Sequence, residues 1–358
     1  MTRERRSLSR RRVLLGMAAV GGFIAVDIGA VLYAGGWVAT GGRLTPQGII
    51  DAFRWVNGPQ LGFRKNHGKG VAVAGYFDSN GAGQEISTAA VFRQGRTAVE
   101  GRFSLASGNA HQADTDAVVR GLGLAFGFPG GEQWRTAMVN LPVFPDNSPQ
   151  GFRDRLIASK AVPATGKPDP QATARFLAEH PETARAMKII KAAPTTKGFA
   201  DSTFRGLNAF YFVNAAGVRT PVRWSFAPLQ TVSAPTSASS DPNWLFDDLI
   251  RQFHGGPLRW RLLLTVGAEN DPVNDATTPW PAERRVIDAG TLTLTGIFTE
   301  AAGNARDVNF DPLVLPSGIQ PSEDPLLSPR SAVYAASYRL RATEPTSAPA
   351  VDVDEVRL

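Results

Sequence analysis

The chain has 358 residues, of which 43% are hydrophobic, so it can bury a large core, and its 36 glycines and 26 prolines favour turns and short strands over a helical bundle. It contains no cysteine, which excludes disulfides, cysteine-bound metal clusters and thiol nucleophiles. The net charge of +6 includes +4 from residues 1–40, so the rest of the chain is close to neutral and no nucleic-acid partner is expected.

Residues 1–40 combine a basic start with a long apolar stretch. Arg10 and Arg11 precede residues 13–38, which are mostly apolar and are interrupted by glycines and by Asp27. Paired arginines before such a stretch resemble a twin-arginine export signal, but they could equally flank a single membrane helix. We therefore predict that the body lies in a periplasmic or extracytoplasmic location, either released or tethered to the inner membrane.

Helices are predicted where a capping residue is followed by proline, because these residue types favour the N-cap and the first helical position. The pattern occurs at Thr45-Pro46, Ser148-Pro149, Asp169-Pro170 and Asp241-Pro242.

Strands are predicted from short runs of apolar, β-branched and aromatic residues. These runs are 71–77, 89–92, 97–103, 121–128, 207–213, 221–226, 258–266 and 290–294. Many are separated by turns alone, with a hairpin across 214–217, so they indicate an antiparallel sheet, and about eight strands would suffice to close a barrel. Residues 298–329 are expected to form an extended arm and residues 343–358 a flexible C-terminal tail.

One histidine stands out among the four in the chain. His67 lies among glycines and basic residues immediately before the strand predicted at 71–77. A solvated loop histidine is the plainer interpretation on spacing alone, and a proton-transfer group is the alternative. The other three histidines form no pair with metal-ligand spacing, and the glycine-rich residues 121–123 lack the strand-loop-helix context of a dinucleotide site.

Six short segments together resemble a known family. They are Arg-x-x-His-x-Lys-Gly at 64–70, Arg-Phe-Ser at 102–104, Asn-Leu-Pro-Val-Phe at 140–144, the helix and strand entry at 244–260, Phe-Asp-Pro at 310–312 with the proline-rich residues 316–322, and Arg-x-x-x-Tyr at 330–334. In this order, over residues 62–341, they resemble the haem catalase superfamily, in particular its short bacterial branch of catalase-related peroxidases. The resemblance implies an α+β fold, a catalase-type antiparallel eight-stranded β-barrel with helical insertions, over residues 41–342, and haem b as the cofactor.

On the proximal side, the resemblance implies that Tyr334 is the axial ligand of the haem iron. A tyrosine binds iron well only as the phenolate, and Arg330, one helical turn earlier, would favour that form by its charge. The plainer alternative is a salt-bridging arginine beside an interfacial tyrosine.

On the distal side, the resemblance implies that His67 transfers a proton, Asn140 donates a hydrogen bond to peroxide and Ser104 fixes the imidazole ring. The plainer alternatives are a turn residue for Asn140 and a backbone-bonded serine for Ser104. Three arginines, Arg64, Arg102 and Arg341, match positions that meet the haem propionates, and solvation at the surface is their alternative.

Some features depart from the family pattern. Tyr338 stands where catalases usually have a histidine, and the distal asparagine follows Met138 and Val139 where another asparagine is usual. No flavodoxin-like domain is appended and the leader replaces the long N-terminal arm, so neither a bound nicotinamide cofactor nor a tight tetramer is expected. The oligomeric state stays open.

The function implied is a haem-dependent peroxidase that reduces hydrogen peroxide or organic peroxides with a small organic electron donor, via a ferryl intermediate. One alternative is a true catalase that dismutes hydrogen peroxide to oxygen and water. Another is a non-catalytic haem-binding barrel, which would need Tyr334 but not His67, Ser104 and Asn140.

Overall fold

The computed structural model describes residues 44–116, 118–128, 130–232 and 241–356. The leader predicted at residues 1–40 lies outside the described residues. In the part of the chain that is described, no helix is both long and apolar enough to cross a membrane.

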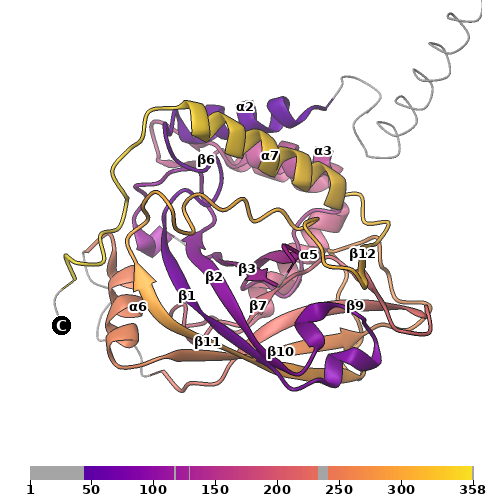
Figure 1. Cartoon of the computed structure of the whole chain (residues 1–358). Coiled ribbons are helices and arrows are strands. Elements are labelled where there is room, and N and C mark those ends of the chain that lie inside the picture. The colour runs from indigo at the N-terminus through magenta and orange to yellow at the C-terminus, as the bar shows by residue number, and fades with distance from the viewer. Residues whose placement is uncertain (1–43, 117, 129, 233–240, 357–358) are drawn as a thin grey trace, which may run out of the picture.

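A closed antiparallel barrel of eight strands forms the centre of the molecule (Figure 1). Its strands, in spatial order, are β10 (Leu258–Val266), β11 (Val286–Phe298), β1 (Gly70–Ser79), β2 (Gly95–Leu105), β3 (Arg120–Gly127), β4 (Gln133–Val139), β7 (Phe204–Arg205) and β9 (Arg219–Pro228). Pairing of β9 with β10 closes the ring. Two further strands, β8 (Phe210–Val213) and β12 (Ile319–Pro321), extend outward from β9, and β5 (Ala161–Val162) pairs with β6 (Lys167–Pro168) in a separate hairpin. The predicted eight-stranded barrel is confirmed.

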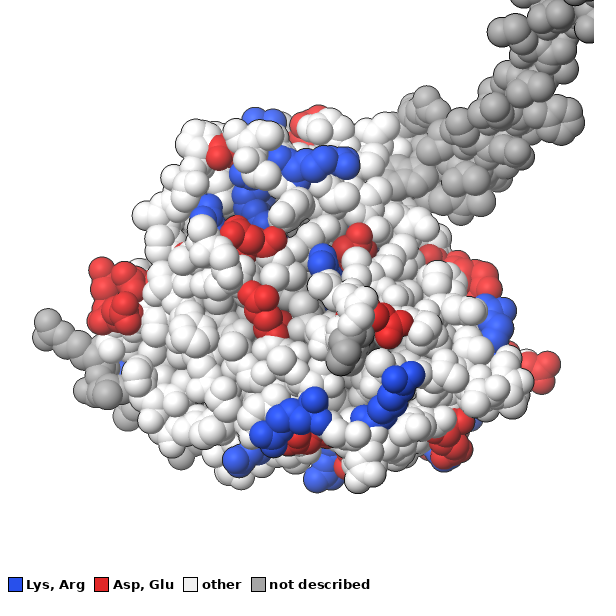
Figure 2. Space-filling view, in the orientation of Figure 1, with Lys and Arg blue, Asp and Glu red and all other residues white. Residues whose placement is uncertain are grey.

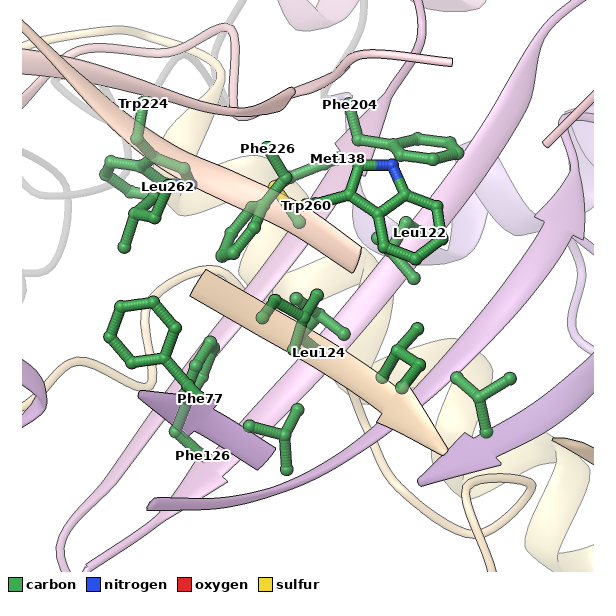
Figure 3. Packing of buried hydrophobic residues seen from close by; sticks show 14 of the residues in the cluster. Phe77, Leu122, Leu124, Phe126, Met138, Phe204, Trp224, Phe226, Trp260 and Leu262 are labelled. Atoms are coloured by element: carbon green, nitrogen blue, oxygen red, sulfur yellow. The ribbon is translucent and has the colours of Figure 1, made fainter. Parts of the chain in front are cut away.

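Large apolar side chains fill the barrel (Figure 3). Trp224 and Trp260 are buried there, and their indole nitrogens donate to Thr136 Oγ1 at 3.1 Å and to the Ser202 carbonyl at 3.1 Å. These two indoles keep hydrogen-bond partners, whereas the buried indole nitrogens of Trp134 and Trp244 have none among the described residues.

A close backbone approach bends β1 against β11. The register between them shifts at Ala74 and Gly75, and a Cβ on Gly75 would lie 2.0 Å from the Thr293 carbonyl oxygen. Only glycine fits there, and a bulge of this kind increases local twist, which helps a sheet to close.

Helices cover the barrel on the outside. They are α2 (Pro46–Asn57), α3 (Pro149–Ala158), α4 (Pro170–Glu179), α5 (Pro181–Ala192), α6 (Trp244–His254) and α7 (Leu327–Thr343), with three short 3₁₀ turns, η1 (Ala82–Glu85), η2 (Ala90–Phe92) and η3 (Asp114–Asp116). Figure 1 shows α2, α3 and α7 together over one end of the barrel, and α2 contacts both of the others. Residues of all three helices line one side of a cavity.

Three of the predicted helix starts are confirmed by their caps. Thr45, Ser148 and Asp169 each accept a hydrogen bond from a backbone N–H in the first turn, at 3.0, 3.1 and 2.9 Å. The fourth helix begins later, at Trp244, with Asn243 at the N-cap.

Several predicted elements differ from the structure. Residues 89–92 were predicted as a strand, but Ala90–Phe92 form η2. Val91 and Phe92 are buried, as strand residues would be, but no described strand pairs with them. Strand β4 was missed because Arg135 and Thr136 interrupt its apolar run, although Trp134 and Met138 are buried. Helix α5, which starts at Pro181, was also missed.

The last residues lie against the body. Val351 and Val353 are buried in the main core cluster, and the Val353 backbone N–H donates to Thr299 Oγ1 at 2.9 Å. Val351 and Val353 are therefore packed against the body, whereas Pro345, Thr346, Ala348 and Pro349 of the expected tail are exposed.

Charged residues of both signs are scattered over the face shown in Figure 2. This distribution agrees with the near-neutral charge of the body.

Candidate active site

A cavity of about 630 Å³ lies between the barrel and the helical layer. It is lined from the loop before β1, from β2 and β3, and from α2, α3 and α7. Seven of the eight predicted site residues line it, namely Arg64, His67, Arg102, Ser104, Arg330, Tyr334 and Arg341. Residues as far apart in the chain as Arg64 and Arg341 thus meet around one cavity.

His67 sits in a strained turn. Its φ of 57° lies in the left-handed region, which costs a residue with a side chain about 1–3 kcal/mol. The Gly68 backbone N–H donates to the Ser107 carbonyl at 2.8 Å, and Arg102 Nη1 donates to the His67 carbonyl at 2.7 Å. The structure therefore holds this residue in a conformation that a free loop would not favour.

The imidazole of His67 is oriented by a neighbouring strand. Its Nδ1 lies 3.0 Å from Ser104 Oγ, and Ser104 stands opposite Gly70 in the β1–β2 ladder. Because Nδ1 is engaged, Nε2 is the ring nitrogen left for a molecule in the cavity. Burial, followed by the positive charges of Arg102 and Arg64, lowers the pKa of His67 to about 3. The ring is thus neutral at ordinary pH and can accept a proton.

The loop that carries His67 is fixed by two buried lysines. Lys65 Nζ forms an ion pair with Glu344 at 2.6 Å, and Lys69 Nζ forms one with Asp114 at 2.6 Å. All four side chains are at least nine-tenths buried. Each pair ties the loop to a distant part of the chain.

Asn140 is the one predicted site residue outside the cavity lining. It lies directly after β4, where its Oδ1 accepts from the Arg120 backbone N–H at 2.9 Å and its Nδ2 donates to the Val118 carbonyl at 3.3 Å. It is absent from the cavity lining, whereas its neighbours Val139 and Leu141 are present. Both side-chain groups of Asn140 thus meet backbone at the end of β4, as in the plainer alternative, and a hydrogen bond from Asn140 to peroxide stays a prediction.

Tyr334 and Arg330 lie one turn apart on α7, as the spacing predicted, and both line the cavity. Arg330 Nη1 donates to Asn208 Oδ1, and Asn208 Nδ2 donates to Asp324 Oδ2 at 2.8 Å. Asn208 and Asp324 are buried, and burial raises the pKa of Asp324. This network holds Arg330 on the side of α7 that carries Tyr334.

Sequence reasoning missed both Asn208 and Asp324. Asn208 falls within a run predicted as a continuous strand, and Asp324 within the expected extended arm. Only the positive φ of Leu207, 63°, reveals that the chain turns just before Asn208.

The three predicted propionate arginines differ in their partners. Arg64 Nη2 donates to the carbonyls of Ala305, Arg306 and Val308 at 3.0, 3.1 and 2.8 Å, whereas its buried Nε has no partner. The Arg341 guanidinium makes no hydrogen bond to any described residue. Arg102 is paired with Glu300 at 2.7 and 2.9 Å.

Glu300 was also missed, since it follows β11 at the start of the expected arm. Burial alone would raise its pKa, but the charges of Arg102, Arg64 and Arg341 and the hydrogen bonds from Arg102 lower the pKa overall. Glu300 is therefore a carboxylate that partly balances three buried arginines.

Fold and site together define a barrel protein with a large internal pocket that joins a neutral histidine, a tyrosine and buried arginines. The Catalase family model matches residues 48–351. A "Catalase-related peroxidase" of Synechococcus elongatus is 35% identical over 309 residues, which cover 86% of this chain and 91% of that protein. Another, of Mycolicibacterium paratuberculosis, is 31% identical over 304 residues, which cover 84% and 96%.

Catalase A from Saccharomyces cerevisiae shares the fold, with a TM-score of 0.69 at 22% identity, and the match covers 85% of this chain and 67% of that one. The chain belongs to the catalase family. The predicted resemblance is confirmed.

Membership of this family implies a haem cofactor. The residues present fit such a group. The cavity volume of about 630 Å³ falls within the range of about 300–1,000 Å³ usual for ligand pockets, and apolar residues such as Ile50 and Phe53 line part of it. The unpartnered buried Nε of Arg64 and the guanidinium of Arg341, which hydrogen-bonds to no described residue, suit carboxylates. Tyr334 offers a phenol oxygen as an iron ligand.

Proposed function

We propose that this protein is a haem b peroxidase, which reduces hydrogen peroxide or organic peroxides with electrons from a small organic donor. The observation that carries the proposal is the neutral imidazole of His67, held by Ser104 in one cavity with Tyr334 and the arginines. The names of the two bacterial relatives support the same activity.

Bound haem would supply the iron that binds peroxide and takes up its oxidising equivalents. The residues of the chain do the rest. Tyr334, one turn from Arg330 on α7, would offer its phenol oxygen to the iron. His67 Nε2 accepts a proton from one peroxide oxygen and returns it to the other, so that water or an alcohol leaves. Ser104 keeps the ring in the orientation that this transfer needs.

The rival is dismutation of hydrogen peroxide to oxygen and water, which the matched family model and the 27% identical catalase of Mus musculus favour. An oxygen electrode separates the two. We expect little oxygen when hydrogen peroxide alone is added to the haem-loaded protein, and rapid oxidation of a phenolic dye when the dye follows. Vigorous oxygen release would support the rival, and inertness in both assays would leave a haem-binding barrel.

We also propose that the protein acts outside the cytoplasmic membrane, exported by a twin-arginine signal or tethered by its leader. The support is the sequence of residues 1–40, in which Arg10 and Arg11 precede the apolar stretch. Replacement of both by lysine should leave the protein in the cytoplasmic fraction. The matched control replaces Arg5 and Arg6 by lysine, and normal export of both variants would favour a plain membrane anchor.

A further inference from the structure

Arg205 lines the cavity but stands in none of the sequence motifs. It lies on β7, and its guanidinium makes one hydrogen bond to a described residue, from Nη1 to the Thr203 carbonyl at 3.2 Å. No acidic side chain in the described part of the chain pairs with it. Its Nε and Nη2 are therefore available to a molecule in the cavity.

The other cations of the cavity wall have charged neighbours. Three of them are held in ion pairs, namely Lys65 with Glu344, Arg102 with Glu300 and Arg155 with Asp146. The charges of Arg102 and Glu300 also act on Arg64 and Arg341. These four residues thus form one charge cluster, which contains the arginines that match the propionate positions.

Arg205 stands apart from that charge cluster. Burial alone lowers the pKa of Arg205, and no charged group contributes to the change. A partly buried cation without an acidic partner is costly, and a ligand with a negative charge would offset that cost. A carboxylate is the natural ligand, because it matches the planar fork of a guanidinium.

The register of the sheet places Arg205 in one row with the residue that orients His67. Ser104 of β2 pairs with Gly121 of β3, and Gly121 pairs with Val139 of β4. Val139 pairs in turn with Arg205. All four line the cavity. Neighbouring strands lie about 4.7–4.9 Å apart, so this row spans about 14 Å along one wall.

The wall between the two ends of the row is apolar. Gly121 has no side chain, and Val139 presents only methyl groups. Leu141 and Leu207, which follow Val139 and Arg205 by two positions, also line the cavity. A base at one end, a cation at the other and an apolar wall between them suit a chain molecule with a carboxylate at one end.

We propose that Arg205 binds the carboxylate of a long-chain organic hydroperoxide, whose peroxide group then lies beside His67. The inference rests on the proposed peroxidase function and names a substrate class for it. The peroxide is assigned here because it must pass a proton to His67, whereas a donor need only supply electrons. Reduction breaks the O–O bond, takes two electrons and two protons from two donor phenols, and releases the alcohol and water.

Linoleate binding to the haem-loaded full chain provides a readout that does not depend on turnover, because linoleate has the chain and the carboxylate but no peroxide group. Calorimetry should show about 10- to 100-fold weaker binding in Arg205→Gln, as expected for a lost hydrogen bond between charged groups. Arg205→Lys keeps the charge and should recover part of the affinity. The matched control is Arg259→Gln, which removes an exposed arginine of β10 and should bind as the wild type does.

Stopped-flow mixing with a linoleate hydroperoxide and with its methyl ester extends the test to the reaction. The wild type should react about 10- to 100-fold faster with the acid than with the ester, and Arg205→Gln should lose this preference. Equal rates for acid and ester in the wild type would overturn the inference without any variant, so a variant that fails to fold cannot hide the answer.

Two further measurements exclude the other sources of a carboxylate. Haem release to apomyoglobin should be no faster in Arg205→Gln than in Arg259→Gln, and faster release would assign Arg205 to the cofactor and overturn the inference. The donor p-hydroxyphenylpropanoate is compared with its amide. If Arg205→Gln loses a preference for this acid and keeps that for the hydroperoxide acid, the carboxylate belongs to the donor and the inference fails.

The binding experiment also separates this inference from the proposed function. If Arg205→Gln weakens linoleate binding as expected while the wild type reduces no peroxide, the proposed peroxidase activity fails and the carboxylate site stands. If the wild type is an active peroxidase and linoleate binds Arg205→Gln as tightly as Arg259→Gln, the carboxylate site fails alone.

Discussion

Gly121 on β3 lies directly behind the His67–Ser104 pair, so a single added methyl group tests the site geometry. A Cβ at this position would lie 2.8 Å from Ser104 Oγ and 2.9 Å from both Nδ1 and Cε1 of His67. Ordinary contacts begin at 3.4 Å, so Gly121→Ala must push the pair by about 0.6 Å. Since a 1 Å misplacement can cost about 100-fold in rate, we expect the reaction with hydrogen peroxide to slow about tenfold. Overpacking should lower the free energy of unfolding by about 1–3 kcal/mol.

Stopped-flow mixing of the ferric haem protein with hydrogen peroxide measures this rate, and thermal unfolding measures the stability. Gly127→Ala is the matched control, because Gly127 lies on the same strand and its Cβ would meet nothing within 4 Å. A wild-type rate in Gly121→Ala would refute the reasoning, since it would mean that the pair can move without consequence. Equal losses in both variants would point to a general effect of alanine in β3.

Three further predictions follow from the same geometry. Tyr334→Phe should abolish the ferric tyrosinate absorption of the haem-loaded protein, and an unchanged spectrum would place the ligand elsewhere. Because burial, followed by Arg102 and Arg64, lowers the pKa of His67 to about 3, the unfolded chain binds this proton first as the pH falls. Stability is therefore lost between about pH 6.5 and pH 3, and in His67→Gln the free energy of unfolding should fall less steeply over that range. Lys65→Met leaves Glu344 buried without its ion-pair partner and should cost about 3–5 kcal/mol of unfolding free energy. Arg285→Met, which breaks an exposed pair with Glu85, should leave the unfolding free energy almost unchanged.

The barrel could be predicted because most of its strands are short runs of apolar, β-branched and aromatic residues, many of them separated by turns alone. The hairpin of β8 and β9 and the caps at Thr45, Ser148 and Asp169 depend on neighbouring residues alone, so their patterns can be read directly. The prediction of a strand at 89–92 was wrong because local pattern does not decide there. Val91 and Phe92 are buried as strand residues are, but no described strand pairs with this segment.

The site was predictable only as far as its motifs reach. His67, Ser104, Arg330 and Tyr334 stand in short patterns, and the structure gathers them around one cavity. Glu300, Asn208 and Asp324 stand in no pattern, because their roles come from partners that are 116 to 198 positions away in the chain. Asn140 stands in a matching motif, but a motif does not show which groups a side chain will bond. In the structure its amide hydrogen-bonds to the backbone of Val118 and Arg120.

The buried pair between Lys65 and Glu344 also has a consequence for the order of events during synthesis. The two residues are 279 positions apart, and Glu344 follows the last residue of α7, the helix that carries Tyr334. The loop that holds His67 thus receives its final anchor only after nearly the whole chain has left the ribosome. A cofactor that needs the finished pocket would therefore enter it only after Glu344 has been synthesised and has paired with Lys65.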